Sequence, residues 1–285
     1  MTVAIEQSGV TPVDLPVPPI TRSSKVYLIG AGPGDPGLMT LKGKALLEQA
    51  DVVIYDALVS EGVLAMINPA AEQIHAGKRR GQHSLIQTET TQLLIEKAQS
   101  HSLVVRLKGG DPFIFGRGGE EMEELIAAGI TVEVVPGITA GIAAASYAGI
   151  PLTHRNYSSS VTFVTGHEAI GKYRPEVNWQ QIALGAETIV IYMGIHKLPQ
   201  IVEALTTAGL PGTTAIALVR WGTRPEQAEL IGQLDTIVTQ VETTGFSAPA
   251  IAVIGAVVQL HQTFPVLHLT EDAIGHPGVL LPIVP

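Results

Sequence analysis

Residues 106–121 of this 285-residue chain read RLKGGDPFIFGRGGEE, and they follow the apolar run Leu-Val-Val at 103–105. The apolar run predicts a buried strand, and the glycine pair at 109–110 predicts its end. A glycine backbone admits a ligand where a Cβ would block it. Lys108 and Arg117 lie on either side of a short apolar stretch and add positive charge. These features indicate a binding loop, although a plain strand, turn and helix start would have the same spacing.

The segment from residue 25 to residue 136 alternates between strand and helix patterns. Strands that are buried on both faces and separated by helices predict a mostly parallel sheet. The predicted strands cover 26–29, 51–55, 73–75, 103–107 and 132–135. The predicted helices cover 40–49, 88–100 and 120–128, the second with Thr88 as its N-cap.

The chain after residue 150 has fewer helices for each strand, which predicts a mixed sheet. Strands are expected at 161–165, 189–193, 215–219, 228–231 and 250–258, with helices near 196–208 and 235–241. We therefore predict two α/β domains, at 25–150 and 151–262, with loose tails at 1–24 and 263–285. Ligands of such sheets bind beyond the carboxyl ends of the strands, so the cleft between the domains is the expected site.

The composition disfavours several classes of function. A net charge of −9 argues against a nucleic-acid or membrane-surface binder. The absence of cysteine excludes disulfides and thiolate metal sites, and the nine histidines form no closely spaced pair, so no metal is expected. The uncharged run at 134–153 contains glycine and proline, which predicts a buried loop and helix rather than a membrane span. A cytoplasmic protein without a signal peptide is expected.

The loop Gly30-Ala-Gly-Pro-Gly-Asp35 lies between a predicted strand and a predicted helix, where dinucleotide-binding proteins carry G-x-G-x-x-G. Asp35 stands where the third glycine is required, and its carboxylate would repel a phosphate. Pro33 lacks an N–H that a pyrophosphate would bind. The loop therefore suits a ligand without phosphates, such as S-adenosylmethionine (SAM), and disfavours a nicotinamide oxidoreductase. A simple tight turn is the alternative interpretation.

Further motifs follow in order along the chain: Val53-Ile-Tyr-Asp56, Gly77-Lys-Arg79, Pro136-Gly-Ile-Thr-Ala140, Pro151-Leu-Thr-His-Arg155 and Tyr192-Met-Gly194. Together with the two loops above, they closely resemble the uroporphyrinogen-III C-methyltransferases of the tetrapyrrole methylase family, over about residues 25–261. The resemblance implies a homodimer with the tetrapyrrole methylase fold. It also implies conversion of uroporphyrinogen III to precorrin-2 in siroheme and cobalamin biosynthesis. In that reaction SAM methylates C-2 and C-7 in succession and leaves as S-adenosylhomocysteine (SAH).

The resemblance also implies a cofactor site in the cleft. Its residues would be Pro33, Gly109, Gly110, Asp111, Ile114, Thr139, Ala140, Met193, Gly222 and Ala250. Asp111 is expected to accept hydrogen bonds from the ammonium or ribose hydroxyls of SAM. Thr139 and Ala140 begin a helix whose first N–H groups could bind the cofactor, although a plain helix start explains them nearly as well.

The implied substrate carries many carboxylates, so cations are expected around it, arginine above all. The implied substrate-binding residues are Arg79, His83, Arg117, Glu120, His154 and Arg155, with Lys78 and Arg106 as further candidate anchors. Glu120 would orient Arg117 or simply favour the helix N-terminus. Asp56 matches the family position of the proton acceptor and Lys78 that of the proton donor. A helix cap at Asp56 and a carboxylate-binding role for Lys78 are the alternatives.

Two other kinds of function stay open at this point. The first is a different methylase of the same fold, acting later in corrin synthesis or on a protein or RNA. The second is a non-catalytic sensor that binds SAM or a tetrapyrrole.

Overall fold

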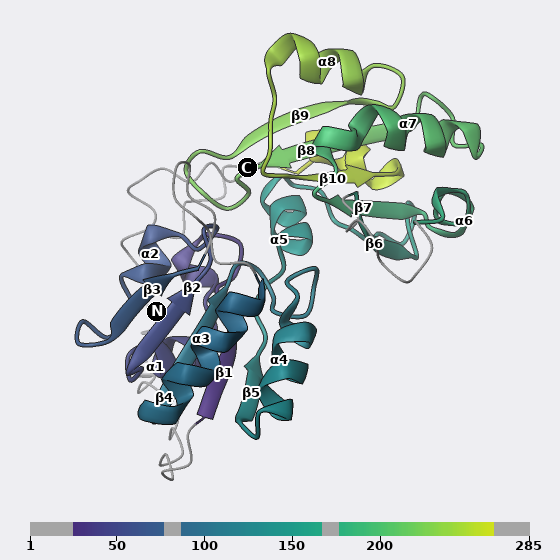
Figure 1. The fold of residues 1–285 in the computed structure, drawn as a ribbon. Coiled ribbons are helices and arrows are strands. Elements are labelled where there is room, and N and C mark those ends of the chain that lie inside the picture. The colour runs from purple at the N-terminus through teal and green to yellow at the C-terminus, as the bar shows by residue number, and fades with distance from the viewer. Residues whose placement is uncertain (1–24, 77–86, 167–176, 265–285) are drawn as a thin grey trace, which may run out of the picture.

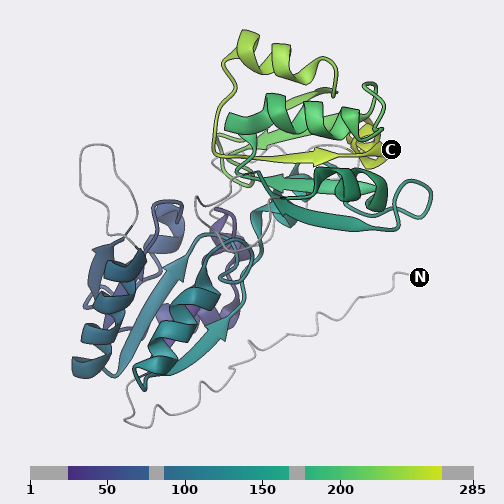
Figure 2. The ribbon, with the colours of Figure 1, turned by 45° about the vertical axis from the view of Figure 1, so that its right-hand side comes forward.

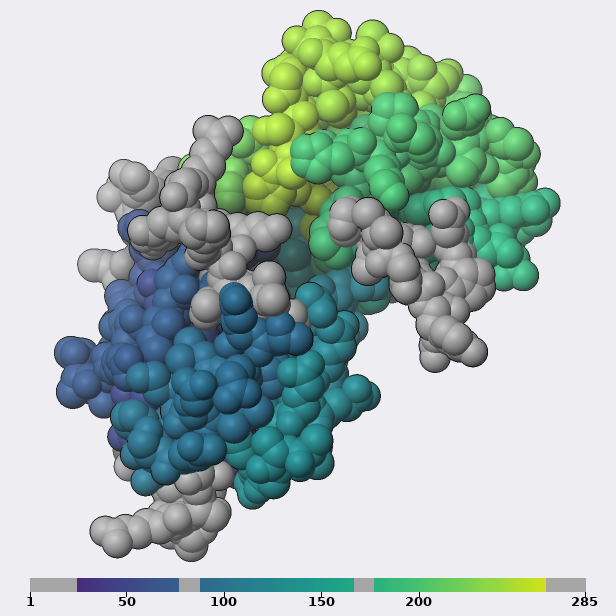
Figure 3. Space-filling model, viewed as in Figure 1, coloured from purple at the N-terminus to yellow at the C-terminus, as the bar shows by residue number. Residues whose placement is uncertain are grey.

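The computed structural model describes residues 25–76, 87–166 and 177–264, which form two α/β units, each built on a five-stranded sheet (Figure 1). Figure 3 shows the units as two lobes, the first at lower left and the second at upper right, and they stay separate in the turned view of Figure 2. The predicted α/β class with two sheets is confirmed. None of the helices in the described ranges is long and apolar enough to cross a membrane.

All five strands of the first sheet run parallel, in the order β3-β2-β4-β1-β5. They are β1 (Lys25–Gly30), β2 (Val52–Tyr55), β3 (Glu72–His75), β4 (Leu103–Lys108) and β5 (Thr131–Val135). β4 is the central strand and is buried along its whole length. The loop after β4 therefore emerges at the middle of the carboxyl edge, where ligands of parallel sheets bind.

Helices cover both faces of the first sheet. They are η1 (Pro36–Leu38), α1 (Leu41–Leu47), α2 (Glu61–Leu64), α3 (Gln87–Ser100) and α4 (Gly118–Ala127). Side chains of β4 alternate between the faces: Leu103, Val105 and Leu107 pack with α1 and α2, whereas Val104 packs with α3 and α4. α2 was not predicted, and the prediction of Thr88 as an N-cap is wrong, because α3 already begins at Gln87.

The second sheet has the order β6-β7-β10-β8-β9, in which only β6 and β7 are parallel, so the predicted mixed sheet is confirmed. Its strands are β6 (Val161–Thr165), β7 (Thr188–Tyr192), β8 (Ala215–Arg220), β9 (Ala228–Gln233) and β10 (Ala250–Ile254). The prediction of one long strand over 250–258 is wrong beyond Ile254. Gly255 takes a φ of +138° there, and the chain turns into the 3-10 helix η3 (Ala256–Gln262).

The faces of the second sheet are covered unequally. One face packs against α6 (Trp179–Gly185), α7 (Leu198–Thr207) and α8 (Ile237–Thr244), and η2 (Ile195–Lys197) leads into α7. The other face packs against η3 and α5 (Ala140–Tyr147), whose Ala144 and Ala145 are buried against the sheet. α5 lies between the two lobes in Figure 1. It follows the loop after β5 in the chain, yet it completes the core of the second unit. The division at residue 150 stays a prediction.

Candidate functional site

The loops after β1, β4 and β5 meet at the carboxyl edge of the first sheet, and glycines make this crossing possible. Gly32 and Gly110 exchange two backbone hydrogen bonds, of 2.7 and 3.1 Å. A Cβ on Gly137 would overlap the carbonyl oxygen of Gly110 and approach Gly30 Cα to 2.7 Å. The glycines that the sequence suggested for ligand access therefore let three backbones pack against one another.

Asp111 joins two of these loops. Its Oδ1 accepts a hydrogen bond from Phe113 N at 2.8 Å, and its Oδ2 accepts one from Gly137 N at 3.1 Å. Both carboxylate oxygens thus bind backbone amides. In this structure Asp111 fixes the loop after β4 to the loop after β5.

Asp35, which replaces the third glycine of a dinucleotide loop, ties the first unit to the second. Its Oδ1 caps η1 through Gly37 N at 2.7 Å, and its Oδ2 accepts a hydrogen bond from the Tyr147 hydroxyl at 2.7 Å. Its backbone N–H donates to Thr223 Oγ1 of the second unit at 3.1 Å. Burial, together with the Asp35 carboxylate, raises the pKa of Tyr147 far above its ordinary value. The loop that contains Asp35 therefore connects the two units through hydrogen bonds.

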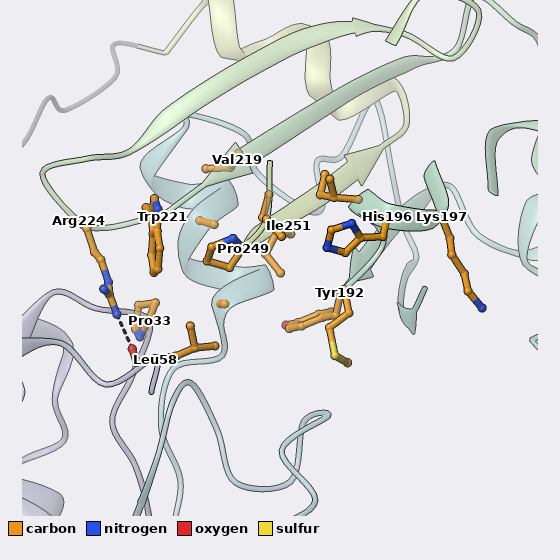
Figure 4. A pocket seen from close by; sticks show the side chains of 17 residues that line it. Pro33, Leu58, Tyr192, His196, Lys197, Val219, Trp221, Arg224, Pro249 and Ile251 are labelled. Atoms are coloured by element: carbon orange, nitrogen blue, oxygen red, sulfur yellow. Dashed lines mark hydrogen bonds between the residues drawn. The ribbon is translucent and has the colours of Figure 1, made fainter. Parts of the chain in front are cut away.

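A mostly apolar cavity of about 400 Å³ lies between the two units, next to Pro33 of the same loop (Figure 4). Pro33 and Leu58 line it from the first unit, and Trp221, Pro249 and Ile251 are among the residues that line it from the second. Arg224 borders it as well. The Arg224 guanidinium lies 4.7 Å from the centre of the Trp221 ring and donates a hydrogen bond to the Leu58 carbonyl (dashed in Figure 4). The volume is in the range of small-molecule sites.

Half of the predicted cofactor residues line this cavity, namely Pro33, Ala140, Met193, Gly222 and Ala250. The remainder, Gly109, Gly110, Asp111, Ile114 and Thr139, lie outside its lining. Ile114 packs against the core of the second unit. Met193 was expected inside a strand, but it follows β7 with a φ of +53°, and Trp221 has a φ of +49°. Left-handed backbone at residues other than glycine is typical of ligand-binding regions.

Tyr192, which belongs to the Tyr192-Met-Gly194 motif but was given no role from the sequence, fixes the start of α5 beside the cavity. Its hydroxyl bonds Thr139 Oγ1 at 2.7 Å and accepts a hydrogen bond from Gly141 N at 2.8 Å. Burial raises the pKa of Tyr192, against the effect of these two hydrogen bonds, so the hydroxyl stays neutral. Because Thr139 follows Pro136-Gly137, Tyr192 links the glycine crossing to the second sheet.

We expect Tyr192→Phe to lower the free energy of unfolding by about 1–3 kcal/mol, because it leaves two buried polar groups without their partner. Urea unfolding followed by circular dichroism measures this change. Tyr157→Phe is the matched control, since Tyr157 is 38% exposed, and its effect is expected within about 0.5 kcal/mol. Equal effects of the two substitutions would contradict the proposed link.

Four charged side chains, Asp56, Arg106, Lys108 and Glu121, form what we call the buried charge cluster. Arg106 Nε and Lys108 Nζ both donate to Glu121 Oε1, at 3.1 and 2.9 Å. Arg106 Nη2 donates to Asp56 Oδ1, and Lys108 Nζ lies 4.0 Å from Asp56 Oδ2. The side chains of Arg106, Lys108 and Glu121 are at most 4% exposed, whereas that of Asp56 is 31% exposed. Of the four, only Asp56 reaches solvent substantially.

The two cations of the cluster respond differently to their surroundings. Burial opposes the charge of Arg106, but Asp56 and Glu121 outweigh it and raise the pKa of this guanidinium. Burial, and next the Arg106 charge, lower the pKa of Lys108 despite the two carboxylates. Arg106, a candidate substrate anchor in the sequence, is thus enclosed by protein and unavailable to a substrate. Lys108 and Glu121 were missed as partners of Asp56. The sequence does carry a signal for such partners, because the strand at 103–108 is otherwise apolar but has cations at the alternate positions 106 and 108. Cations on one face of a buried strand indicate that carboxylates pack against them.

The predicted substrate residues are only partly described. Lys78, Arg79 and His83 lie outside the described residues. Arg117 donates from Nε and Nη2 to Glu120 Oε2, which is the contact expected if Glu120 orients Arg117. The bond to Glu120, ahead of the other causes, raises the pKa of Arg117.

His154 and Arg155 lie between α5 and β6. The His154 ring packs against the Tyr157 ring with centroids 5.0 Å apart, and Arg155 is exposed. No group of three or more histidine or acidic side chains in the described ranges is arranged to hold a metal ion.

Known proteins resemble this chain in sequence and in fold. The family model of the tetrapyrrole (corrin/porphyrin) methylases matches residues 25–238. A uroporphyrinogen-III C-methyltransferase of Synechocystis sp. is 70% identical over 234 residues, 82% of this chain and 89% of that protein. A siroheme synthase of Nitrosomonas eutropha is 47% identical over 92% of this chain, which spans about half of that longer protein (54%).

A solved structure has the same fold. The crystal structure of uroporphyrin-III C-methyl transferase from Thermus thermophilus, complexed with S-adenyl homocysteine, superposes with a TM-score of 0.72 at 38% identity. The match covers 83% of this chain and 99% of that one. Because the family model matches residues 25–238, about three quarters of the chain, the chain belongs to the tetrapyrrole (corrin/porphyrin) methylase family.

Proposed function

We propose that this protein is a SAM-dependent C-methyltransferase that converts uroporphyrinogen III to precorrin-2, by two successive methylations at C-2 and C-7. The observation that carries the proposal is the apolar cavity between the units, which opens beside Leu58, two residues after Asp56. The activity named for the Synechocystis relative supports the same reaction. The product would enter siroheme and cobalamin biosynthesis.

The cavity residues fit SAM. Trp221 and Pro249 offer flat apolar surfaces suited to an adenine ring, and the Thermus thermophilus relative was crystallised with S-adenyl homocysteine. Pro33 and Leu58 would close the cavity from the first unit, with Met193, Gly222 and Ala250 on the other side. When bound, SAM supplies a methyl group on a positively charged sulfur. The protein contributes by holding the acceptor carbon in line with that methyl group.

The remaining steps fall to polar side chains. Arg117, held by Glu120, together with His154 and Arg155, would bind substrate carboxylates, with Arg79 and His83 as further proposed anchors. After the ring carbon has formed its bond to the methyl group, a proton leaves the tetrapyrrole, and Asp56 would accept it. Lys78 would act as proton donor. Glycines 109 and 110, Asp111, Ile114 and Thr139 are proposed to support the cofactor from the loops around the cavity. We further propose a homodimer in the cytoplasm.

Incubation of the protein with uroporphyrinogen III and SAM tests the reaction. Mass spectrometry of the tetrapyrrole should show a gain of two methyl groups, with two SAH released for each product. A gain of one methyl group on a precorrin, with none on uroporphyrinogen III, would instead identify a later corrin methylase. Tight SAH binding without any product would identify a sensor.

Trp221 allows cofactor binding to be measured apart from catalysis. The chain has two tryptophans, and Trp179→Phe removes the other, which lies at the start of α6. In this variant we expect SAH to change the fluorescence of Trp221 in a saturable manner. Trp221→Leu should raise the Kd for SAH about 10-fold, since stacking of a base on an aromatic ring contributes about 1–3 kcal/mol. A Kd that does not respond to Trp221→Leu in calorimetry would exclude Trp221 from the cofactor site.

A further inference from the structure

The proposed methyl transfer gives no role to three members of the buried charge cluster, Arg106, Lys108 and Glu121, and the last two hydrogen-bond to members of the cluster. Neither Lys108 nor Glu121 lines the cavity, and both are almost completely buried. Buried charges are costly unless each is paired and hydrogen-bonded, so a strand end that served only packing would carry apolar side chains. Val104, on the same face of β4, is such a side chain.

The contacts of the cluster converge on one carboxylate. Glu121 Oε1 accepts from both Arg106 and Lys108, and it thereby fixes the two cations of β4 side by side. Arg106 also donates to the carbonyls of Ile54 and Leu107, at 3.4 and 3.3 Å, so its guanidinium is anchored to the backbone. Both cations then face Asp56, which is the exposed end of the cluster.

We propose that Glu121 and Lys108 are positioning residues for Asp56. Glu121 acts through Arg106, and Lys108 acts directly on Asp56. Together they fix the direction of the Asp56 carboxylate and set the pH at which it accepts a proton. This inference rests on the proposed function for its catalytic consequence. The charges of the four residues balance, two positive and two negative. Removing one charge should therefore change the proton affinity of the Asp56 carboxylate. Removing one positive and one negative charge together should restore the proton affinity, because the net charge of the cluster is again zero.

Other charged and polar residues lie on the helices α4 and α3 beside the cluster. α4, which carries Glu121, also carries Glu120, Glu123 and Glu124, and Arg117 is its N-cap residue. The bond to Glu120 is the main cause of the raised pKa of Arg117, and the charges of Glu121 and Glu124 add to it. α3, which packs beside α4, contributes the apolar side chains of Leu94 and Ala98 to the same core, and its Thr90 and Thr91 are buried polar residues. The Asp56 carboxylate itself contacts the cluster through Arg106 and Lys108.

The test uses three variants: Glu121→Gln, Lys108→Met and the double variant. The Asp56 carboxylate is followed by ¹³C NMR in protein labelled at aspartate, and its signal is identified by its loss in Asp56→Asn. Relative to the wild type, the titration midpoint of Asp56 should fall by about one pH unit in Glu121→Gln and rise by about one unit in Lys108→Met. It should return toward the wild-type midpoint in the double variant. Glu123→Gln, on the exposed side of the same helix, should not move it.

The acid limb of the pH profile of kcat should shift in the same directions, and the Kd for SAH should stay within about twofold, since the cluster does not line the cavity. If Lys108 and Glu121 had only a structural role, all three variants would be less stable, and the titration midpoint of Asp56 would not shift in opposite directions in the two single variants. Unmoved midpoints, or losses in the double variant that simply add, would overturn the inference even if the wild type methylates. Opposite midpoint shifts in a protein that forms no methylated product would support the charge arrangement and overturn the proposed function instead.

Discussion

Asp56→Asn is expected to lower kcat by about 10²- to 10⁴-fold, the range found when a general base is removed. The amide oxygen of asparagine can still accept the hydrogen bond from Arg106, so the arrangement of the cluster is kept while the proton acceptor is lost. Because Asp56 does not line the cavity, the Kd for SAH should change by less than about twofold. Initial rates of SAH release and calorimetry measure the two quantities.

Asp51→Asn is the matched control for this substitution. Asp51 lies just before the opposite end of the same strand and accepts hydrogen bonds from Ser102 N and Leu103 N, at 3.0 and 2.8 Å. Its replacement should leave kcat unchanged, since it is far along the strand from the carboxyl edge. If Asp56→Asn retained the wild-type kcat, Asp56 would have no part in the proton transfer.

Gly137→Ala is expected to cause the largest loss of stability among single methyl additions at the carboxyl edge. The new Cβ would overlap the carbonyl of Gly110, a residue that two backbone hydrogen bonds hold to Gly32 and that cannot move alone. Overpacking of this kind costs about 3 kcal/mol, which lowers Tm by about 6–12 °C. Differential scanning calorimetry measures the change.

Gly119→Ala provides the comparison. Gly119 lies in the first turn of α4, and a Cβ there would meet nothing within 4 Å. Alanine favours the helix by up to about 1 kcal/mol, so this substitution should leave Tm unchanged or raise it slightly. A fall in Tm equal to that of Gly137→Ala would mean that the crossing of the three loops tolerates a side chain.

Local patterns in the sequence were sufficient to predict most of the fold. The apolar run at 103–105 and the alternation around it predicted the parallel sheet, because each buried strand is bounded by glycine or by a polar turn. The sheet of the second unit was predicted to be mixed, because this part of the chain has fewer helices for each strand. The end of β10 was missed, since the apolar residues that continue after Ile254 pack as a 3-10 helix rather than as a strand.

The candidate site was harder to predict, because its contacts join residues far apart in the chain. Gly110 was predicted as a cofactor residue, and its two backbone hydrogen bonds to Gly32 were not predicted. Trp221 has no local signal of its own, and the motif that contains Tyr192 did not indicate its role. Both residues acquire their positions when β7 and β8 pack against α5. Lys108 and Glu121 are 13 residues apart and meet only after α4 folds onto the sheet.

The placement of α5 has a consequence for how the chain can be divided. A cut at residue 150 would separate α5 from the sheet that it covers, and the C-terminal fragment would expose Val190, Val219 and Val253 to water. Exposed apolar strands of this kind promote aggregation. Anyone who dissects this protein should start the C-terminal fragment before Thr139, so that α5 remains with its own core.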